Sequence, residues 1–220
     1  MSMRMNAAEG LLGRLHWLGH ASFRLDGPPT IYFDPWNLKG RLPQADVVLI
    51  SHEHHDHCSP EDVARISGPG TVIVASTGAV PRLRGNVRGL GPGERMTVAE
   101  VEIEAVPAYN IDKFRSPGVP FHPQEAGHVG YVVTVEGVRL YFAGDTDHIP
   151  EMADIRCDVA LLPVGGTYTM DAQEAAQAAA DIGPQVAVPM HWGAGVVGTR
   201  RDAERFRDLY GGEVAILEPG

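Results

Sequence analysis

Cysteine and long apolar runs are both scarce in this chain of 220 residues. Cys58 and Cys157 are its two cysteines, and no Cys-x-x-Cys pair is present. This pattern excludes a disulfide-stapled fold. No run of about eighteen apolar residues exists, so we expect no membrane-spanning segment. The first ten residues lack the apolar stretch of a signal peptide, which predicts a cytoplasmic protein.

Positive charge is also in short supply. The chain has 18 Lys and Arg against 28 Asp and Glu, a net charge of −10. Because phosphate groups are neutralised by Lys and Arg, this balance argues against a general nucleic-acid or membrane-surface binder. It does not exclude an anionic substrate, since bound metal ions would reverse the local field. The composition, 44% hydrophobic and 21% charged, is that of an ordinary globular protein with a sizeable core.

Short strand-like segments recur along the chain. Val47–Ile50 and Val72–Ala75 are continuous apolar runs, typical of strands covered on both faces. Val101–Ala105 alternates between apolar and acidic residues, which predicts one buried and one wet face. Glu136-Gly137 predicts a tight hairpin turn. Further strands are expected at Arg14–Trp17, Ser22–Leu25, Ile31–Phe33, Val132–Val135, Val138–Phe142, Ala160–Leu162 and Val186–Val188.

Helices are fewer but clearly marked. Ser59-Pro60 offers an N-cap followed by proline. Asp171–Glu174 resembles a capping box and opens an Ala-rich helix that should end near Gly183. A third helix should open at Thr199–Asp202. The order of elements predicts two packed sheets with helices outside. Residues 110–128 lack periodicity and predict a long functional loop.

The segment Ser51–Cys58 carries the strongest chemical signal. It contains the pattern His-x-His-x-Asp-His directly after an apolar strand. Imidazole and carboxylate groups are good ligands for zinc and neighbouring divalent metals. A solvated His-rich loop is the alternative. The end of a buried strand is where open α/β sheets place their ligands, so the context favours a metal site. Cys58 is expected to be a small buried residue.

Two further polar residues follow buried strands. Asp145 comes after Leu140–Ala143, and His191 comes after Val186–Met190. Either residue alone is better explained as an ordinary turn carboxylate or strand-end histidine. Their shared placement changes this, because several strand ends can converge on one edge and supply a binuclear site.

The sequence resembles the metallo-β-lactamase-fold hydrolases, within the branch similar to ascorbate-6-phosphate lactonase. The matching pieces, in family order, are Leu18–Phe23, Asp34-Pro35, the His cluster, Gly144–Thr146 and Met190–Gly193. The resemblance spans nearly the whole chain. It implies an α/β fold, an αββα sandwich of two mixed β-sheets with outer helices, and a single domain over residues 1–220.

The resemblance also implies a set of metal ligands. It gives His52 and His54 to a first metal; Asp56, His57 and His191 to a second; and Asp145 to both. The ions would be Zn²⁺, one or two, with Mn²⁺ or Fe²⁺ as alternatives. His54 stands where redox di-iron relatives carry Glu, which favours zinc and hydrolysis.

Three other residues are left open by the sequence. Asp34 could orient a ligand imidazole, and His20 could line the site, but both could equally be ordinary turn residues. The family usually has another metal-binding His where this chain has Asn110. The first metal could therefore be weak, absent, or completed by a residue of the following loop, with His122 the leading candidate. His122 as a solvent-exposed residue is the alternative.

These observations predict a metal-dependent hydrolase. Metal-bound hydroxide would attack an ester, lactone or phosphodiester, with Asp56 orienting it while ligating metal. Tyr109, Lys113 and Arg115 are candidate anion contacts. The expected partner is a small-molecule substrate, without nucleic acid or membrane; the oligomeric state is left open. The rival hypothesis is a non-catalytic metal-binding or sensor protein on the same fold.

Overall fold

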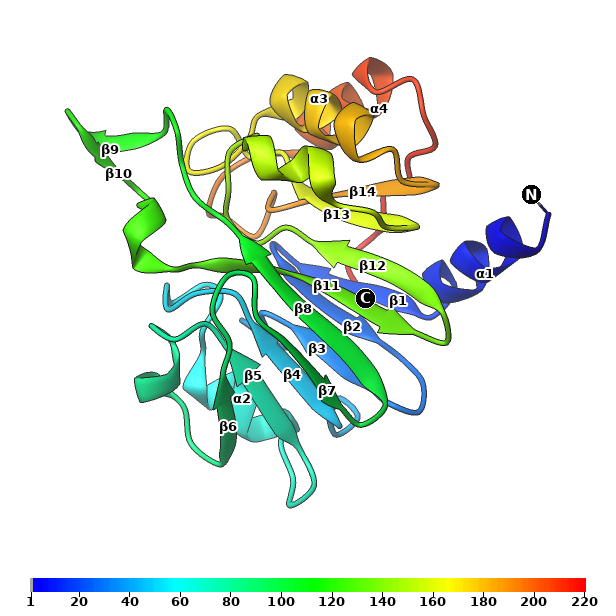
Figure 1. Cartoon of the computed structure of the whole chain (residues 1–220), viewed down its shortest axis with the longest axis vertical. Helices are drawn as coiled ribbons and strands as arrows, with labels where there is room; N and C mark the ends of the chain where they lie inside the picture. Colours follow the sequence, from blue (N-terminus) through cyan, green and yellow to red (C-terminus); the bar gives the residue numbers. More distant parts are fainter. Residues whose placement is uncertain (1) are drawn as a thin grey trace.

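The computed structural model describes residues 2–220, with side chains from residue 7 onward. Two six-stranded sheets form its centre (Figure 1). Each is mixed, with antiparallel strands on one side and parallel strands on the other. The predicted α/β fold, with two mixed sheets and outer helices, is confirmed.

The first sheet runs in chain order from β1 to β6. The pairings of β1, β2 and β3 are antiparallel, while those from β3 to β6 are parallel. Its strands are β1 Leu15–Gly19, β2 Ser22–Leu25, β3 Ile31–Phe33, β4 Val47–Ile50, β5 Val72–Ala75 and β6 Asn86–Gly89.

The second sheet has the order β14-β13-β12-β11-β8-β7. The β11–β12 hairpin turns at Glu136 and Gly137, which both have positive φ, and Val135 pairs with Val138 as the Glu-Gly turn predicts. The strands are β7 Arg95–Val98, β8 Val101–Pro107, β11 Val129–Val135, β12 Val138–Phe142, β13 Val159–Pro163 and β14 Val186–Met190.

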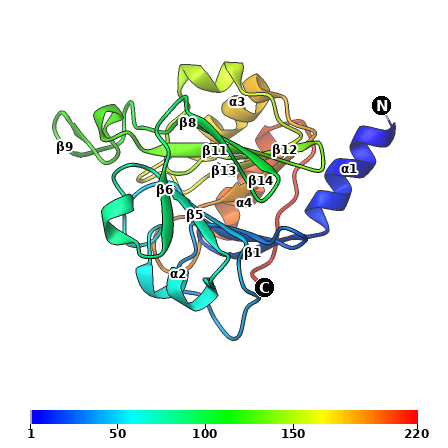
Figure 2. The ribbon, with the colours of Figure 1, turned by 60° about the horizontal axis from the view of Figure 1, so that its bottom comes forward.

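Helices lie outside the two sheets (Figure 2). Helix α2 covers the outer face of the first sheet, where Val63 and Ile66 join an apolar cluster with Val48 and Ile73. Helices α3 and α4 pack beside β13 and β14 on the second sheet. The helices are α1 Ser2–Leu12, α2 Pro60–Ile66, α3 Ala172–Ile182 and α4 Arg200–Leu209, with 3₁₀ turns η1 Val80–Arg82, η2 Gln124–Ala126 and η3 Pro150–Asp154.

The main core lies between the sheets. Phe33 of the first sheet and Phe142 of the second are fully buried, with ring centroids 5.3 Å apart. The alternation of strand side chains explains this: Phe33 and Leu49 point into the main core, while Tyr32 and Val48 point to the α2 side. Strands covered on both faces therefore read as continuous apolar runs.

Several elements differ from the sequence prediction. Strands β6 and β7 and helix α1 were not expected, and the 110–128 segment contains a small β9–β10 hairpin, Phe114–Ser116 and Val119–Pro120. Strand β6 has mostly exposed side chains, so it carries no apolar run. No helix within the described residues has the length and apolar character needed to cross a membrane.

Candidate metal centre

Strand ends bring the predicted residues together. The His cluster follows β4, Asp145 follows β12, and His191 follows β14. Gly144 has a φ of +66°, and a Cβ there would lie 2.9 Å from the Val129 carbonyl oxygen, so glycine is needed before Asp145. His191 is also in the left-handed region, with a φ of 58°. Strained backbone of this kind clusters at functional sites.

The first group contains three imidazoles, those of His52, His54 and His122. The His54 Nδ1 atom lies 3.1 Å from His52 Nε2 and 3.2 Å from His122 Nε2. The Oδ2 atom of Asp145 is 3.3 Å from His122 Nε2. Four ligands about 2.0 Å from one zinc ion at tetrahedral angles lie about 3.3 Å apart. The distances of 3.1, 3.2 and 3.3 Å match that spacing, while Asp145 Oδ2 lies 3.9 Å from His52 Nε2, so the three imidazoles with Asp145 beside them fit one zinc ion.

The second group contains His57, His191, Asp56 and His20. The other oxygen of Asp145, Oδ1, is 3.2 Å from His57 Nε2 and 3.1 Å from His191 Nε2. These three buried atoms find no properly oriented hydrogen-bond partner among the described residues. Leaving several buried polar atoms unpaired is costly, and a cation between them would satisfy all three. The donor set therefore fits a second metal ion beside the first.

Hydrogen bonds fix the tautomers of the candidate ligands. Ser51 Oγ donates to Asp34 at 2.5 Å, so it accepts from His52 Nδ1 at 2.9 Å. His57 Nδ1 donates to the same Asp34 carboxylate at 2.7 Å. In its neutral form each imidazole would therefore present an Nε2 lone pair to the site. Such carboxylate-linked imidazoles are typical of metal ligands. Asp34 thus has the orienting place that the sequence left open.

Asn110 holds His122. Its Oδ1 atom accepts from His122 Nδ1 at 2.9 Å and from the His122 backbone N–H at 2.8 Å. Its Nδ2 donates to Asp147 Oδ1 and to the Tyr168 carbonyl, both at 2.9 Å. His122 is 1% exposed, so the solvent-exposed alternative is wrong. Asn110 orients an imidazole toward the first group instead of entering it.

The electrostatics suit metal binding. Burial lowers the pKa of His122 to about 4 and that of His52 well below its usual value, so both imidazoles are neutral near pH 7, as metal ligation requires. Burial alone would raise the pKa of Asp145, but His191 and His57 hold it well below its ordinary value. The ionised carboxylate at the centre of the cluster is a strong attraction for a cation.

Asp56 and His20 meet at the edge of the second group. His20 Nε2 donates to Asp56 Oδ2 at 3.1 Å. Despite burial, this hydrogen bond and His57 lower the pKa of Asp56, so the carboxylate is ionised. Asp56 also lines a cavity of about 200 Å³ at the mouth of the site. Asp56 is therefore placed where it could reach both a metal ion and a substrate.

Three predicted anion contacts are corrected by the structure. The Tyr109 hydroxyl donates to Glu151 at 3.1 Å, and Lys113 Nζ donates to Glu174 at 2.7 Å. Arg115 is exposed, and none of the three lines the mouth. Their position in or directly before the 110–128 segment suggested the site, but Tyr109 and Lys113 instead bind the neighbouring carboxylates of Glu151 and Glu174.

Other residues at the site had little or no sequence signal. Phe121, Tyr168 and Val196 line the mouth. Asp147 anchors Asn110, and its position two residues after Asp145 could have revealed it. His128, the other histidine of the 110–128 segment, is turned to Glu53 at 3.2 Å.

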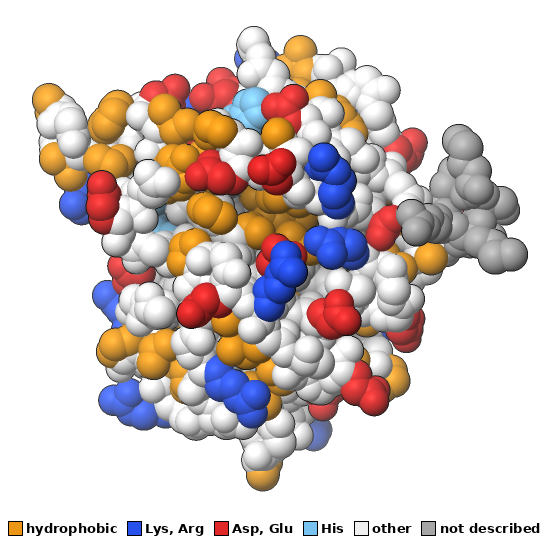
Figure 3. Space-filling model, viewed as in Figure 1, with side chains coloured by type: hydrophobic (Ala, Val, Ile, Leu, Met, Phe, Trp, Pro, Cys, Tyr) orange, Lys and Arg blue, Asp and Glu red, His pale blue; other side chains and the backbone are white. Residues whose placement is uncertain are grey.

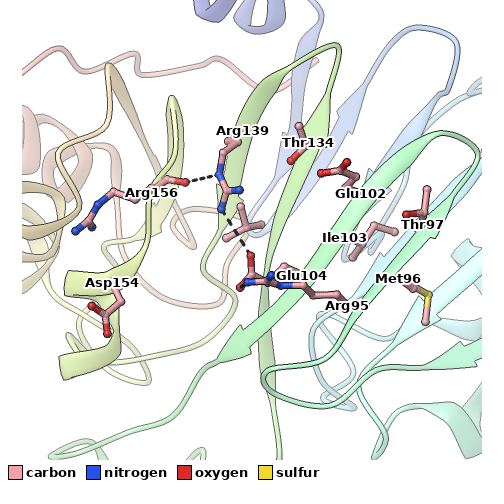
Figure 4. A pocket seen from close by; sticks show the side chains of 11 residues that line it. Arg95, Met96, Thr97, Glu102, Ile103, Glu104, Thr134, Arg139, Asp154 and Arg156 are labelled. Carbon is pink, nitrogen blue, oxygen red and sulfur yellow. Dashed lines mark hydrogen bonds and ion pairs between the residues drawn. The ribbon is translucent and has the colours of Figure 1, made fainter.

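A larger groove lies elsewhere, on the second sheet between β7, β8, β12 and η3 (Figure 4). It holds about 570 Å³, and on that face blue and red side chains surround an apolar area (Figure 3). The charged side chains that line this groove form ion pairs with one another. Glu104 accepts from Arg95 at 2.7 Å and lies 3.6 Å from Arg139. It has no unpaired buried polar atom among the described side chains, so the His cluster remains the candidate site.

The fold and the buried His–Asp cluster define a metallo-β-lactamase-type protein. Residues 14–191 match the model of the β-lactamase superfamily domain. The chain is 36% identical to a UPF0173 metal-dependent hydrolase of Methanoculleus marisnigri, with 94% of each chain covered. A second relative of that name, from Thermococcus kodakarensis, is 33% identical over 94% of this chain and 97% of its own.

Solved structures of metal-dependent hydrolases support the same family assignment. A crystal structure from Parabacteroides distasonis aligns with a TM-score of 0.80 and 33% identity, covering 93% of both chains. Igni18, a metallo hydrolase from Ignicoccus hospitalis, aligns with a TM-score of 0.72 and 25% identity, covering 94% of this chain and 95% of its own. The chain belongs to the UPF0173 family of metal-dependent hydrolases in the β-lactamase superfamily. The predicted enzyme class is confirmed.

Proposed function

We propose that the protein is a zinc-dependent hydrolase acting on an ester, lactone or phosphodiester. The observation that carries the proposal is the pair of ligand groups that share Asp145. His52, His54 and His122 would hold a first ion, and Asp56, His57 and His191 a second, with Asp145 between them. The nitrogen-rich donor set favours zinc over Mn²⁺ or Fe²⁺.

The chain's own residues prepare the reaction. When bound, the metal lowers the pKa of water and makes a nucleophile available near neutral pH. The ionised Asp56 carboxylate accepts a hydrogen bond from the attacking water and aims it into the mouth. His20 holds Asp56 in place through its Nε2–H. Asp34 keeps His57 in the tautomer that ligation needs.

Finer assignments belong to the same proposal. The likeness to the ascorbate-6-phosphate lactonase branch supports ester or lactone chemistry, and we propose a cytoplasmic location as part of the same assignment. A small-molecule substrate fits the cavity of about 200 Å³. The rival, a non-catalytic metal-binding protein, depended on the missing His at position 110. His122 offsets that loss, since its Nε2 faces His54 at 3.2 Å.

Metal content and turnover test the proposal together. Purified protein should contain one or two equivalents of zinc and hydrolyse p-nitrophenyl esters or bis-p-nitrophenyl phosphate. The double variant His52→Ala/His54→Ala should lose the first ion, while His148→Ala, which removes an imidazole bound to Asp181, should keep it. Protein without metal after metal-replete preparation, or fully loaded protein inert toward every ester and diester, would contradict it.

Asp56 should matter more for turnover than for folding. It lies in the loop after β4 and is 9% exposed at the cavity, so it contributes little to the core. Asp56→Ala should lower kcat by at least a hundredfold while moving the unfolding midpoint of metal-free protein only slightly. Thermal unfolding and turnover should be measured on one preparation. Unchanged turnover with a large loss of stability would refute this role.

A further inference from the structure

The mouth of the metal centre has an apolar wall. Phe121 and Tyr168 meet edge to face, with ring centroids 4.8 Å apart and planes at 86°. Val196 adds a third apolar side chain to the same cavity. Edge-to-face pairs are preferred aromatic arrangements, so the wall is a defined surface. A substrate's apolar group packed there would be removed from water.

Hydrogen bonds and chain connectivity link this wall to His122, a candidate ligand of the first metal. The Tyr168 carbonyl accepts from Asn110 Nδ2 at 2.9 Å, and Asn110 in turn holds His122 at 2.9 Å. Phe121 directly precedes His122 in the chain. The two aromatic rings are therefore held at a fixed place relative to the first ligand group. A substrate group resting on them would have its reactive carbon oriented toward the site.

The mouth offers no lysine or arginine for an anionic group, and its three imidazoles face other partners: His54 and His122 belong to the first ligand group, and His55 Nδ1 lies 3.5 Å from Asp56. Its eight lining residues, all within the described part of the chain, include neither Lys nor Arg. Lys113, which belongs to the 110–128 segment but does not line the mouth, forms ion pairs with Glu174 and Asp112. The carboxylates of Asp56 and Asp145 also line the cavity, and both face the candidate metal positions. A negative charge on the substrate away from the reacting centre would therefore lose water without gaining a lysine or arginine partner.

We infer that the natural substrate is a small, uncharged carboxylic ester or lactone whose apolar acyl part packs against Phe121 and Tyr168. The inference rests on the proposed hydrolase function and narrows it. The cavity of about 200 Å³ is below the usual range for drug-sized ligands, which limits the acyl part to a short chain. In the reaction, the oxygen of water bonds to the acyl carbon and the bond to the alkoxy oxygen breaks. One proton passes to the alcohol, and the other leaves as the carboxylic acid ionises.

A matched pair of substrates tests the inference. p-Nitrophenyl hexanoate and mono-p-nitrophenyl adipate share leaving group and chain length, and differ in a terminal methyl or carboxylate. With the zinc-loaded enzyme, after subtraction of the uncatalysed rate, kcat/KM should be at least tenfold higher for the hexanoate. Bis-p-nitrophenyl phosphate is assayed in parallel.

Two variants of Tyr168 locate the effect at the wall. Tyr168→Ala should raise KM for the hexanoate at least fivefold with a smaller change in kcat, and Tyr168→Phe, which restores the ring without the hydroxyl, should recover most of that loss in KM. Leu209→Ala, which trims an exposed side chain on α4, is the remote control. Binding of the neutral ketone 2-heptanone, followed by saturation-transfer NMR, should weaken in Tyr168→Ala alone. This readout does not depend on turnover, and zinc content should be equal in all four proteins.

The outcomes separate the two proposals. Equal rates for the two esters, a preference for adipate, or hydrolysis of the phosphodiester alone would overturn the substrate class and leave the hydrolase function standing. A Tyr168→Ala enzyme with unchanged KM and unchanged ketone binding would overturn the role of the wall. A fully loaded protein inert on every compound would overturn both proposals.

Discussion

At the residue scale, Asn110 fixes the orientation of His122 within the first candidate ligand group. A neutral amide is a poor zinc ligand, but it is a good acceptor for an imidazole N–H. Asn110 Oδ1 takes both N–H groups that His122 offers on that side, at 2.8 and 2.9 Å. The Asp147 carboxylate accepts hydrogen bonds from Asn110 Nδ2 and from the backbone N–H groups of Ile111 and Asp112. The amide is therefore held with its oxygen toward His122.

Replacing Asn110 should weaken zinc binding without touching a ligand. Asn110→Ala leaves His122 Nδ1 unpaired and free to rotate or change tautomer. We expect a ten- to hundredfold loss of affinity at the first site, the range seen when ligand-orienting groups are removed. Zinc competition with a fluorescent chelator measures it. Asn86→Ala, at an exposed position on β6, is the control. Equal affinities in Asn110→Ala and wild type would contradict the role.

Cys157 provides a pH-dependent probe of the fold. Burial raises the pKa of its thiol to about 12, against an ordinary value of 9.0. The folded thiol therefore stays protonated where the unfolded one ionises. This contribution to stability is complete below pH 9 and is lost as the pH rises from 9 toward 12.

Iodoacetamide labelling tests Cys157. Because the thiolate is the reactive form, native protein at pH 8.5 should label at Cys157 at least tenfold more slowly than protein in 8 M urea. Peptide mass spectrometry distinguishes Cys157 from Cys58. Native labelling as fast as unfolded labelling would show that the thiol is accessible and ionised, against this prediction.

At the element scale, local capping fixes where the helices begin. Ser59 caps α2 through the Asp62 backbone N–H, at 3.3 Å. Asp171 caps α3 by accepting from the Gln173 and Glu174 backbone N–H groups at 2.8 and 2.9 Å, and the Glu174 carboxylate accepts from the Asp171 backbone N–H at 2.7 Å. This reciprocal arrangement depends on residues three apart, so it can be predicted from sequence.

Loss of the α3 cap should have a local cost. Asp171→Ala removes the acceptor for two backbone N–H groups and should lower the free energy of unfolding by about 1 kcal/mol. Urea denaturation measures the difference. Asp181→Ala, which removes an acid near the other end of the same helix, is the matched control and should cost less. A larger effect at Asp181 would contradict the capping argument.

At the scale of the whole molecule, one core joins the two sheets. Phe23 and Phe33 from the first sheet contact Phe142 from the second, with ring centroids 6.4 and 5.3 Å away. The ligand groups also draw on both sheets, since His52 follows β4 and Asp145 follows β12. We propose from this shared core that residues 1–220 form a single domain.

Removing the metal should show whether the two sheets unfold together as one domain. A ligand bound only to the folded state, at a thousand times its Kd, stabilises by about 4 kcal/mol. Stripping zinc with a chelator should therefore lower the Tm by roughly 10 °C in a chain of this size. Calorimetry should give one transition with and without metal. Two separate transitions would refute the single domain, and an unchanged Tm would argue against structural coupling of the metal.

The sequence by itself determined the elements and most of the chemistry. Apolar runs, capping residues and the Glu136-Gly137 turn depend on neighbouring residues, so the strands and helices they predict lie where expected. The cluster His52–His57 is equally local. Strand β6 could not be predicted from the sequence, because its mostly exposed side chains form no apolar pattern.

Only the tertiary structure decided how the site is assembled. That Asp145 faces both ligand groups, that Asn110 turns His122 inward, and that Phe121 meets Tyr168 all depend on contacts between distant parts of the chain. These contacts follow from how the two sheets pack and how the 110–128 segment folds back. No spacing in the sequence encodes them, because the energies that select them come from burial and hydrogen bonding across the whole fold.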